Sequence, residues 1–320
     1  MRLNRLDLNQ LVILDALLDE RSPSKVAARL HVTQPAISAA LRNLRAYFDD
    51  PLFIQSGRKM AATPFAEGLA VPVRDLLLRG EQITRLRPAH TVATYRRMVK
   101  IAVSDFVATV LLAPILRSAI IQAPLVRFEL VSVFDSRHHY HEDLERGEVD
   151  VLILPDDYAS PKHKRQVILD EAYVCIACRN NRATKNGVSV EDYLKAGHVG
   201  VTNRTVAGRP YDEMHIARQG YTRRIEVAVP SLLWIPAMIV GTKRLSTVHY
   251  HLARDMARRW PIRILRCPVE IPPLREVMQW HEYQENDPAI AWLRSNLVVA
   301  AKRLSTARTA ACVTAKAKER

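Results

Sequence analysis

Residues Ser24 to Phe48 read SKVAARLHVTQPAISAALRNLRAYF, and this stretch decides the fold of the first part of the chain. Its second half has apolar residues at helical spacing: Ile37, Leu41, Leu44 and Phe48. This period predicts a helix that buries one stripe and leaves its other face open. The helix is expected to begin near Thr33, whose hydroxyl can cap the first turn, with Pro35 where no intrahelical N–H bond is lost. A short apolar stripe precedes it, so two helices are expected to cross at a tight turn.

The open face of the second helix carries amide, hydroxyl and guanidinium groups, on Gln34, Ser38, Arg42 and Arg45. Amides and guanidinium groups make paired hydrogen bonds to base edges in the major groove, and hydroxyls and cations hold phosphates. The pattern predicts a helix-turn-helix whose second helix reads DNA. The alternative is an ordinary helical hairpin with a solvated basic face.

The segments on either side extend this module. Asp7 to Glu20 is expected to form a first helix that packs across the other two. After Phe48, Pro51 to Met60 reads PLFIQSGRKM, two short extended pieces joined at a glycine turn. Arg58 and Lys59 lie at the tip of this hairpin, where they can contact phosphates or the minor groove. The combination predicts a winged helix-turn-helix.

A long helix is expected from Thr63 to Leu86, with Thr63 as its cap and Pro64 at its first position. Leu69, Leu76 and Ile83 are seven residues apart, a spacing that favours a partner helix and hence a dimer. The alternative is that this stripe packs on the chain's own second domain.

The whole chain has 320 residues, which suits two domains, and 48% hydrophobic with 25% charged residues is globular. A net charge of +14 favours a polyanionic partner. We expect no membrane-spanning run of the required ~18 apolar residues and no signal peptide, and therefore a cytoplasmic protein.

From Met98 onward, strand-like and helix-like stretches alternate, which predicts an α/β domain with a mainly parallel sheet. Such sheets bind small ligands beyond the carboxyl ends of their strands. These ends are expected at Ser104-Asp105, Asp135-Ser136 and Pro155-Asp156.

Metal and catalytic sites are not expected. Cys175 and Cys178 are three apart on an apolar strand, so their sulfurs point to opposite faces. The cluster His138, His139 and His141 with Glu142 and Asp143 is interpreted as solvated surface. The chain has no phosphate-binding glycine loop, nucleophile elbow or carboxylate pair in a recognisable context, which predicts no enzymatic activity and no cofactor.

Two groups of residues resemble LysR-type transcriptional regulators: Ala27-Ala28 with Leu30, followed by Thr33-Gln34-Pro35-Ala36-Ile37-Ser38, and later Pro51-Leu52-Phe53 with Thr63-Pro64. The resemblance implies binding to double-stranded DNA as a homodimer or homotetramer, with RNA polymerase as a further candidate partner. The DNA-binding residues are then expected to be Thr33, Gln34, Pro35, Ser38, Arg42, Arg58 and Lys59.

Further motifs are similar to the branch that holds nodulation activators and regulators of aromatic-compound degradation: Ser104-Asp105-Phe106, Arg146-Gly147-Glu148-Val149-Asp150, Gly197-His198-Val199 and Trp280-His281. This implies a small aromatic co-inducer bound between two lobes. The effector-binding residues are then expected to be Ser104, Asp105, Phe106, Asn181, His198 and His251. Asn181 and His251 stand where the branch has a histidine and an arginine. Because His251 replaces an arginine, the site lacks a permanent cation, which favours a neutral or phenolic effector over a benzoate-like acid.

The expected organisation is a winged helix-turn-helix over residues 1–62 and a linker helix and hinge over 63–94. A two-lobed effector domain resembling periplasmic binding proteins follows over 95–301, with lobe I about 95–163 and 269–301 and lobe II about 164–268. Residues 302–320 form a basic tail that we expect to be disordered. The alternative function is a small-molecule-binding or enzymatic α/β domain with an attached DNA-binding module.

Overall fold

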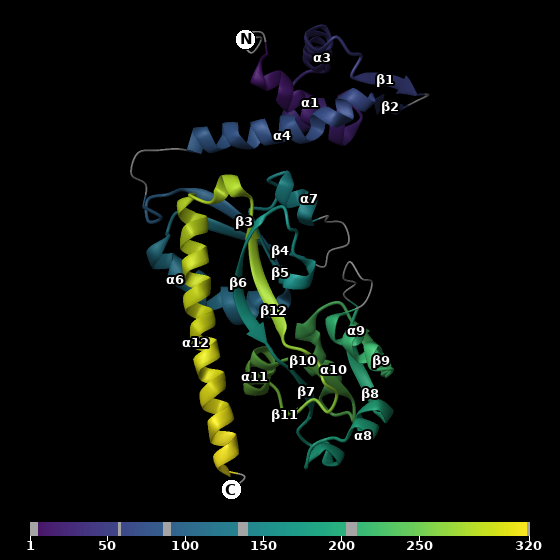
Figure 1. Cartoon of the computed structure of the whole chain (residues 1–320), viewed down its shortest axis with the longest axis vertical. Helices are drawn as coiled ribbons and strands as arrows, with labels where there is room; N and C mark the ends of the chain where they lie inside the picture. Colours follow the sequence, from purple (N-terminus) through teal and green to yellow (C-terminus); the bar gives the residue numbers. More distant parts are fainter. Residues whose placement is uncertain (1–5, 57–58, 86–90, 134–139, 203–209, 319–320) are drawn as a thin grey trace. The chain divides into compact units, whose positions relative to one another are not determined.

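The computed structural model describes residues 6–56, 59–85, 91–133, 140–202 and 210–318. The chain divides into two compact units, Met1–Pro88 and Ala89–Arg320 (Figure 1). Each unit has a hydrophobic core of its own.

The N-terminal unit contains three short helices, a hairpin and a long helix: α1 (Leu8–Glu20), α2 (Pro23–Leu30), α3 (Gln34–Phe48), β1 (Phe53–Ser56), β2 (Lys59–Ala62) and α4 (Pro64–Arg85). Its core takes one stripe from each short helix: Leu11, Leu14 and Leu17 from α1, Val26 from α2, and Ile37 and Leu44 from α3. These are the apolar positions at helical spacing in the sequence. The predicted winged helix-turn-helix is confirmed.

Helix α4 begins as predicted, because Thr63 Oγ1 accepts a hydrogen bond from Ala66 N at 3.1 Å. Its apolar residues divide between two faces. Leu69, Val73 and Leu77 pack on the core of their own unit, against α1. Leu76 and Ile83 stay exposed, at 39% and 68%, so part of the predicted stripe is available for a partner.

The second unit is built on two five-stranded sheets, with the strand orders β4-β3-β5-β12-β6 and β11-β7-β10-β8-β9. The first sheet comprises β3 (Arg97–Val103), β4 (Val126–Ser132), β5 (Val151–Pro155), β6 (Lys164–Glu171) and β12 (Leu274–Trp280). The second comprises β7 (Tyr173–Cys178), β8 (Gly197–Val201), β9 (Arg224–Val229), β10 (Leu245–His249) and β11 (Ile262–Leu265).

Four of the five strands in each sheet run in the same direction, as the predicted mainly parallel sheet requires, and one strand in each, β12 and β7, runs the other way. Strands β3, β4 and β5 are parallel, but β12 is antiparallel to β5 and β6. In the second sheet β8, β9 and β10 are parallel, and β7 is antiparallel to β10 and β11. The antiparallel strands are those by which the chain leaves one sheet for the other and returns, a crossover that periodicity does not reveal.

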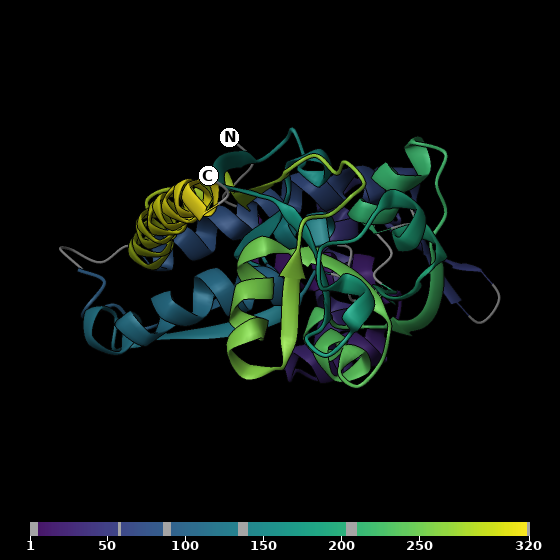
Figure 2. The same ribbon diagram turned by 90° about the horizontal axis from the view of Figure 1, so that it is seen from below.

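Helices cover both faces of the first sheet, in keeping with the alternation of side chains along β3. Val99, Ile101 and Val103 pack in one cluster with residues of α6 (Ala113–Gln122) and α12 (Pro288–Lys318). Ala102 faces the other way, toward Leu144 of α7 (Tyr140–Glu145). Helices α6 and α12 lie side by side (Figures 1 and 2).

The stretch Asp105–Gln122 is apolar and long enough to cross a membrane, although no such run was expected. It is helix α5 (Asp105–Val107), a π-helical turn (Ala108–Leu112) and α6 in succession. The π turn ends two residues before Pro114, which lies in the first turn of α6. Phe106, Leu111 and Leu112 are fully buried in the core of the unit, and a core helix meets the same criteria of length and composition.

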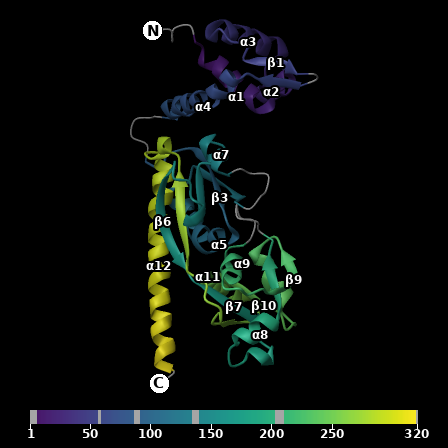
Figure 3. The same ribbon diagram turned by 45° about the vertical axis from the view of Figure 1, so that its right-hand side comes forward.

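Helices also cover both faces of the second sheet (Figure 3). Ile176 and Cys178 of β7 pack with α10 (Ile235–Ile239) and α11 (Tyr250–Arg259), and Cys175 and Ala177 pack with α8 (Val190–Lys195) and α9 (Tyr211–Arg218). Cys175 and Cys178 therefore lie on opposite faces, as the strand period required.

Two boundaries differ from those expected. Lys164–Glu171 pairs with β12 in the first sheet, so the chain enters the second sheet only at Tyr173. Helix α12 extends to Lys318, over most of the tail that was expected to be disordered from residue 302. Alanine, lysine and arginine dominate this tail, and all three favour a helix once a packed turn precedes it.

Candidate functional site

The turn between α2 and α3 follows from two local features. His31 ends α2 in the left-handed conformation, with φ 53°, and Pro35 occupies the first turn of α3. Thr33 is at the N-cap position, but its side chain makes no capping hydrogen bond, contrary to expectation. Its hydroxyl is therefore available for a ligand.

The outer face of α3 is open as predicted. Thr33, Gln34, Pro35, Ser38 and Arg42 are all exposed, whereas Ile37 and Leu44 on the opposite stripe are fully buried. Within the part of the chain that the structure describes, the polar members of this set form no side-chain hydrogen bond or ion pair, which leaves their donors and acceptors open to DNA.

Arg45 was expected on this outer face, and that expectation was wrong. Its guanidinium donates hydrogen bonds to the backbone oxygens of Pro51, at 2.6 Å, and Phe53, at 2.9 Å. Asp50 closes the same turn by accepting from Leu52 N at 2.7 Å. Arg45 therefore ties α3 to the start of the hairpin.

The hairpin itself is formed by β1 and β2 in antiparallel register, from Phe53 opposite Ala62 to Ser56 opposite Lys59. Arg58, at the predicted tip, lies outside the described residues. Lys59 begins β2, and its side chain is also outside the description. The assignment of both as DNA contacts stays a prediction.

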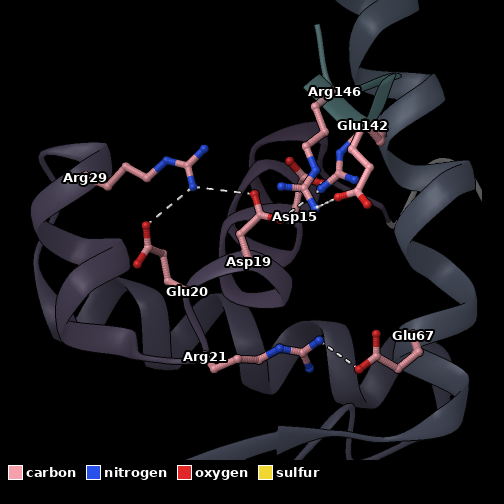
Figure 4. Close-up of polar contacts among 9 residues, drawn as sticks. Asp15, Asp19, Glu20, Arg21, Arg29, Glu67, Glu142 and Arg146 are labelled. Atoms are coloured by element: carbon pink, nitrogen blue, oxygen red, sulfur yellow. Dashed lines mark hydrogen bonds and ion pairs between the residues drawn. The ribbon is translucent and has the colours of Figure 1, made fainter. Parts of the chain in front are cut away.

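Ion pairs join α1 and the residue that follows it to α2 and α4 (Figure 4). Arg74 of α4 pairs with Asp15, at 2.9 Å, and Asp19, at 3.1 Å, both on α1. Arg29 of α2 lies 3.5 Å from Asp19. Arg21, just after α1, pairs with Glu67 of α4 at 2.7 Å. These contacts fix α1 against its neighbours and therefore the base on which α3 rests.

A cavity of about 60 Å³ lies between the two sheets of the second unit, at the carboxyl ends of parallel strands. The first sheet supplies Ser104 after β3 and Tyr158 after β5, and the second supplies Val201 of β8 and His249 of β10. This is the position that parallel strands predict for a ligand site. The predicted strand end at Asp135-Ser136 lies outside the described residues.

The motif residues Ser104, Asp105 and Phe106 lie at or beside this cavity. Ser104 lines it and caps α5 by accepting from Val107 N at 3.3 Å. Asp105 Oδ2 accepts from Leu232 N at 3.1 Å, which links the two lobes. The Phe106 ring is fully buried and stacks on His249 with ring centroids 4.4 Å apart.

His198, Asn181 and His251 do not line the cavity. His198 is fully buried within lobe II, 2.6 Å from Tyr193 O, and burial lowers its pKa to about 4. Asn181 donates to Lys243 O at 3.3 Å at the far end of β7. His251 Nδ1 lies 2.6 Å from Glu171 Oε2. Each of these side chains has an internal structural contact.

Sequence reasoning missed His249 and Glu276, which do line the cavity. His249 ends β10, two residues before His251, which the sequence had suggested instead. Its position at the end of a parallel strand could have identified it as a cavity residue. Glu276 is on β12 at a register shift between Glu276 and Val277. No sequence signal places β12 between β5 and β6 in the first sheet.

Both missed side chains are uncharged at neutral pH. Burial, reinforced by the Glu171 carboxylate, raises the pKa of the Glu276 carboxyl to about 8. Burial lowers the pKa of the His249 imidazole to about 4. The cavity therefore presents a protonated carboxyl group and a neutral imidazole.

Metal chemistry finds no support in the described residues, which contain no group of three or more histidine, cysteine, aspartate or glutamate side chains placed to hold an ion. His138 and His139 lie outside them. His141 lies 2.8 Å from Tyr158 O.

Comparison with known proteins identifies both units. Residues 8–67 match the model of the bacterial regulatory helix-turn-helix proteins of the lysR family, and residues 93–301 match the LysR substrate binding domain. Nodulation protein D 1 of Bradyrhizobium sp. (strain NC92) is 37% identical over 311 residues, which cover 97% of this chain and 98% of that protein. Nodulation protein D 2 of Bradyrhizobium diazoefficiens is 38% identical over 307 residues, 96% and 92% of the two chains.

Two solved structures of transcriptional regulators have the same fold. A probable transcriptional regulator from Pseudomonas aeruginosa superposes with a TM-score of 0.61 at 30% identity, over 92% of this chain and 97% of that one. Full-length OxyR from the same organism shares the fold, with a TM-score of 0.68 at 18% identity over 91% and 94% of the two chains. The chain therefore belongs to the LysR family of transcriptional regulators, with a helix-turn-helix DNA-binding domain followed by an effector-binding domain.

Proposed function

We propose that this regulator acts in the cytoplasm as a homodimer or homotetramer, binds double-stranded DNA through α3 and the hairpin, and activates transcription in response to an uncharged or phenolic aromatic effector. Gln34 and Ser38 read bases, while Arg42, Arg58 and Lys59 hold phosphates. Exposed Leu76 and Ile83 on α4 supply apolar surface for the dimer contact. RNA polymerase is the partner through which activation would proceed.

The residues that line the cleft support the proposal that the effector is uncharged. Three tyrosines line the cavity, Tyr158, Tyr173 and Tyr211, and among the described residues no lysine or arginine does. Besides Glu276, one other acidic residue among the described residues lines the cavity, Asp212. Its carboxylate accepts a hydrogen bond from Arg223 at 2.6 Å. An aromatic carboxylate would lose its hydration here without gaining a cation, whereas an uncharged ring would not bear that cost.

A second cavity of about 340 Å³ adjoins the first, and its lining also favours an uncharged effector. It shares Pro155, Tyr211 and Leu274 with the first cavity and adds three aspartates, at 156, 157 and 170, with Arg275. Arg275 is already bonded to Asp170 at 2.8 Å. Together the two cavities fall within the size range of typical ligand sites, ~300 Å³ or more, and their lining is acidic rather than basic.

Effector binding would then change how far the two lobes are closed on each other. The adjoining cavity is large enough for a ring, but the cavity between the two sheets, at about 60 Å³, is smaller than the ~150 Å³ that holds one benzene molecule, so a ring that reaches His249 requires the cleft to open there. The hydrogen bond between Leu232 N and Asp105 crosses this cleft and would respond to the opening. A ligand that binds the open arrangement more tightly shifts the population toward it, and the linker helices transmit the change to the DNA-binding domains.

Calorimetric titration of the full-length chain with flavone, phenol and benzoate tests the effector class. We expect flavone or phenol to bind more tightly than benzoate at neutral pH. Tight benzoate binding with no binding of the two uncharged compounds would contradict the proposal.

A further inference from the structure

Four buried polar atoms around the cleft cavity have no hydrogen-bond partner among the described residues: Glu276 Oε2, His249 Nδ1, His249 Nε2 and Tyr158 Oη. Their residues all line the same cavity. Glu276 and His249 are only 2% and 8% exposed. An unpaired buried polar atom costs about 1 to 3 kcal/mol, so such a set within one cavity indicates groups kept open for a ligand.

The surrounding structure holds these groups in place. The His249 ring lies between two aromatic rings, Phe106 at 4.4 Å and Tyr173 at 4.9 Å between centroids. Glu276 is fixed in β12, opposite Pro155 of β5 and Leu169 of β6. Tyr158 follows β5 directly. Three elements therefore direct polar atoms into one space from both lobes and from the strand that joins them.

Building on the proposed effector site, we infer that Glu276, His249 and Tyr158 form one recognition set that binds the carbonyl and hydroxyl groups of an uncharged ligand, with the Glu276 carboxyl group as hydrogen-bond donor. His249 offers one N–H and one lone pair, and Tyr158 offers a hydroxyl that donates or accepts. Such a set distinguishes an aromatic ketone or phenol from an unsubstituted hydrocarbon, because a hydrocarbon would leave all four atoms unpaired.

Burial, and after it the Glu171 carboxylate, keep the Glu276 carboxyl group protonated by raising its pKa. Glu171 on β6 is the carboxylate that acts on it, and Tyr173 on β7 lies close enough for the Glu276 charge to raise the tyrosine pKa. Burial lowers the pKa of His249 on β10, which therefore supplies no cation. A ligand carbonyl that accepts from the Glu276 carboxyl needs this proton, so its affinity falls once the carboxyl ionises.

Titration of the full-length protein with flavone, which has a carbonyl group and no ionisable group, tests the inference. Between about pH 7 and about pH 9 the wild-type affinity is expected to fall about tenfold, because a carboxyl with a pKa of about 8 is then mostly ionised. Glu276→Gln keeps a neutral donor of the same shape. It should bind within about twofold of wild type at pH 7 and show no such fall.

Three further variants separate the members of the set. Glu276→Leu, His249→Phe and Tyr158→Phe should each weaken flavone binding roughly threefold to tenfold, the value of one hydrogen bond. His249→Phe keeps the ring stack, and Tyr158→Phe removes only a hydroxyl. Tyr250→Phe is the matched control, because Tyr250 does not line the cavity, and it should bind as wild type does. Thermal melts confirm that each variant is folded.

The outcomes are distinguishable. Flavone binding that is independent of pH and equal in wild type, Glu276→Leu, His249→Phe and Tyr158→Phe would overturn the recognition set and leave the effector class standing. Absence of flavone and phenol binding by the wild-type protein would overturn the effector class and the recognition set together.

Discussion

Replacing Arg45 by alanine is expected to destabilise the DNA-binding unit instead of removing a DNA contact. The variant loses two hydrogen bonds from a charged donor, to Pro51 O and Phe53 O. Each is worth about 1.5 to 3 kcal/mol when fully buried, but Arg45 is only partly buried and water replaces part of the loss. We therefore expect a cost of about 2 kcal/mol, or roughly 10 °C in the melting temperature of a unit of this size.

Arg42→Ala is the matched control, since Arg42 is exposed on the same helix and its side chain forms no hydrogen bond or ion pair with the described residues. Its stability should stay within about 0.5 kcal/mol of wild type, and the slope of log affinity against log salt should become shallower by about 0.9, the effect of one phosphate contact. Urea unfolding of residues 1–88 gives the stability, and DNA titrations across salt give the slope. If Arg45→Ala unfolds like wild type and loses the same salt slope as Arg42→Ala, Arg45 binds DNA and the structural reasoning is wrong.

Three other perturbations test different parts of the molecule. Gln34→Ala should relax base preference at a cost of about 1 to 3 kcal/mol at preferred sites, measured by selection from a randomised DNA pool, and an unchanged preference would remove Gln34 from the reader face. Removal of residues 1–94 should leave a folded domain that binds flavone but not DNA, because the second unit has its own core; an unfolded product in circular dichroism would contradict the division. His198 and His249 have folded pKa values of about 4, below the ordinary 6.5, so the unfolded chain takes up protons first as pH falls, and stability present above about pH 6.5 should decline by up to about 3 kcal/mol per histidine toward pH 4 in urea titrations.

The DNA-binding unit could be predicted almost completely from sequence because its signals are local. Pro35, the apolar period from Ile37 and the Thr63-Pro64 cap each act within a few residues. Arg45 was misplaced because its partners are the carbonyls of Pro51 and Phe53 on either side of Leu52. Their positions depend on the left-handed conformation of Leu52, with φ 57°, which the residue type does not predict.

The effector cleft was predicted only in part. Ser104 could be placed because it ends a strand and caps a helix in consecutive residues. Glu276 could not, since its site depends on β12 returning from the second sheet to pair between β5 and β6, more than a hundred residues away. His198 was chosen from its position at a strand, but its 2.6 Å contact with Tyr193 O turns the ring into the lobe.

Genome-wide mapping of DNA bound by the full-length protein tests whether the chain is a sequence-specific regulator that responds to an uncharged aromatic effector, with wild type compared against the double variant Gln34→Ala, Arg42→Ala. We expect wild type to occupy discrete sites that share a sequence motif, and its occupancy to change when flavone is added. The double variant, folded by thermal melt, should lose these sites. Equal occupancy by both proteins, or the absence of discrete wild-type sites with and without flavone, would contradict this expectation.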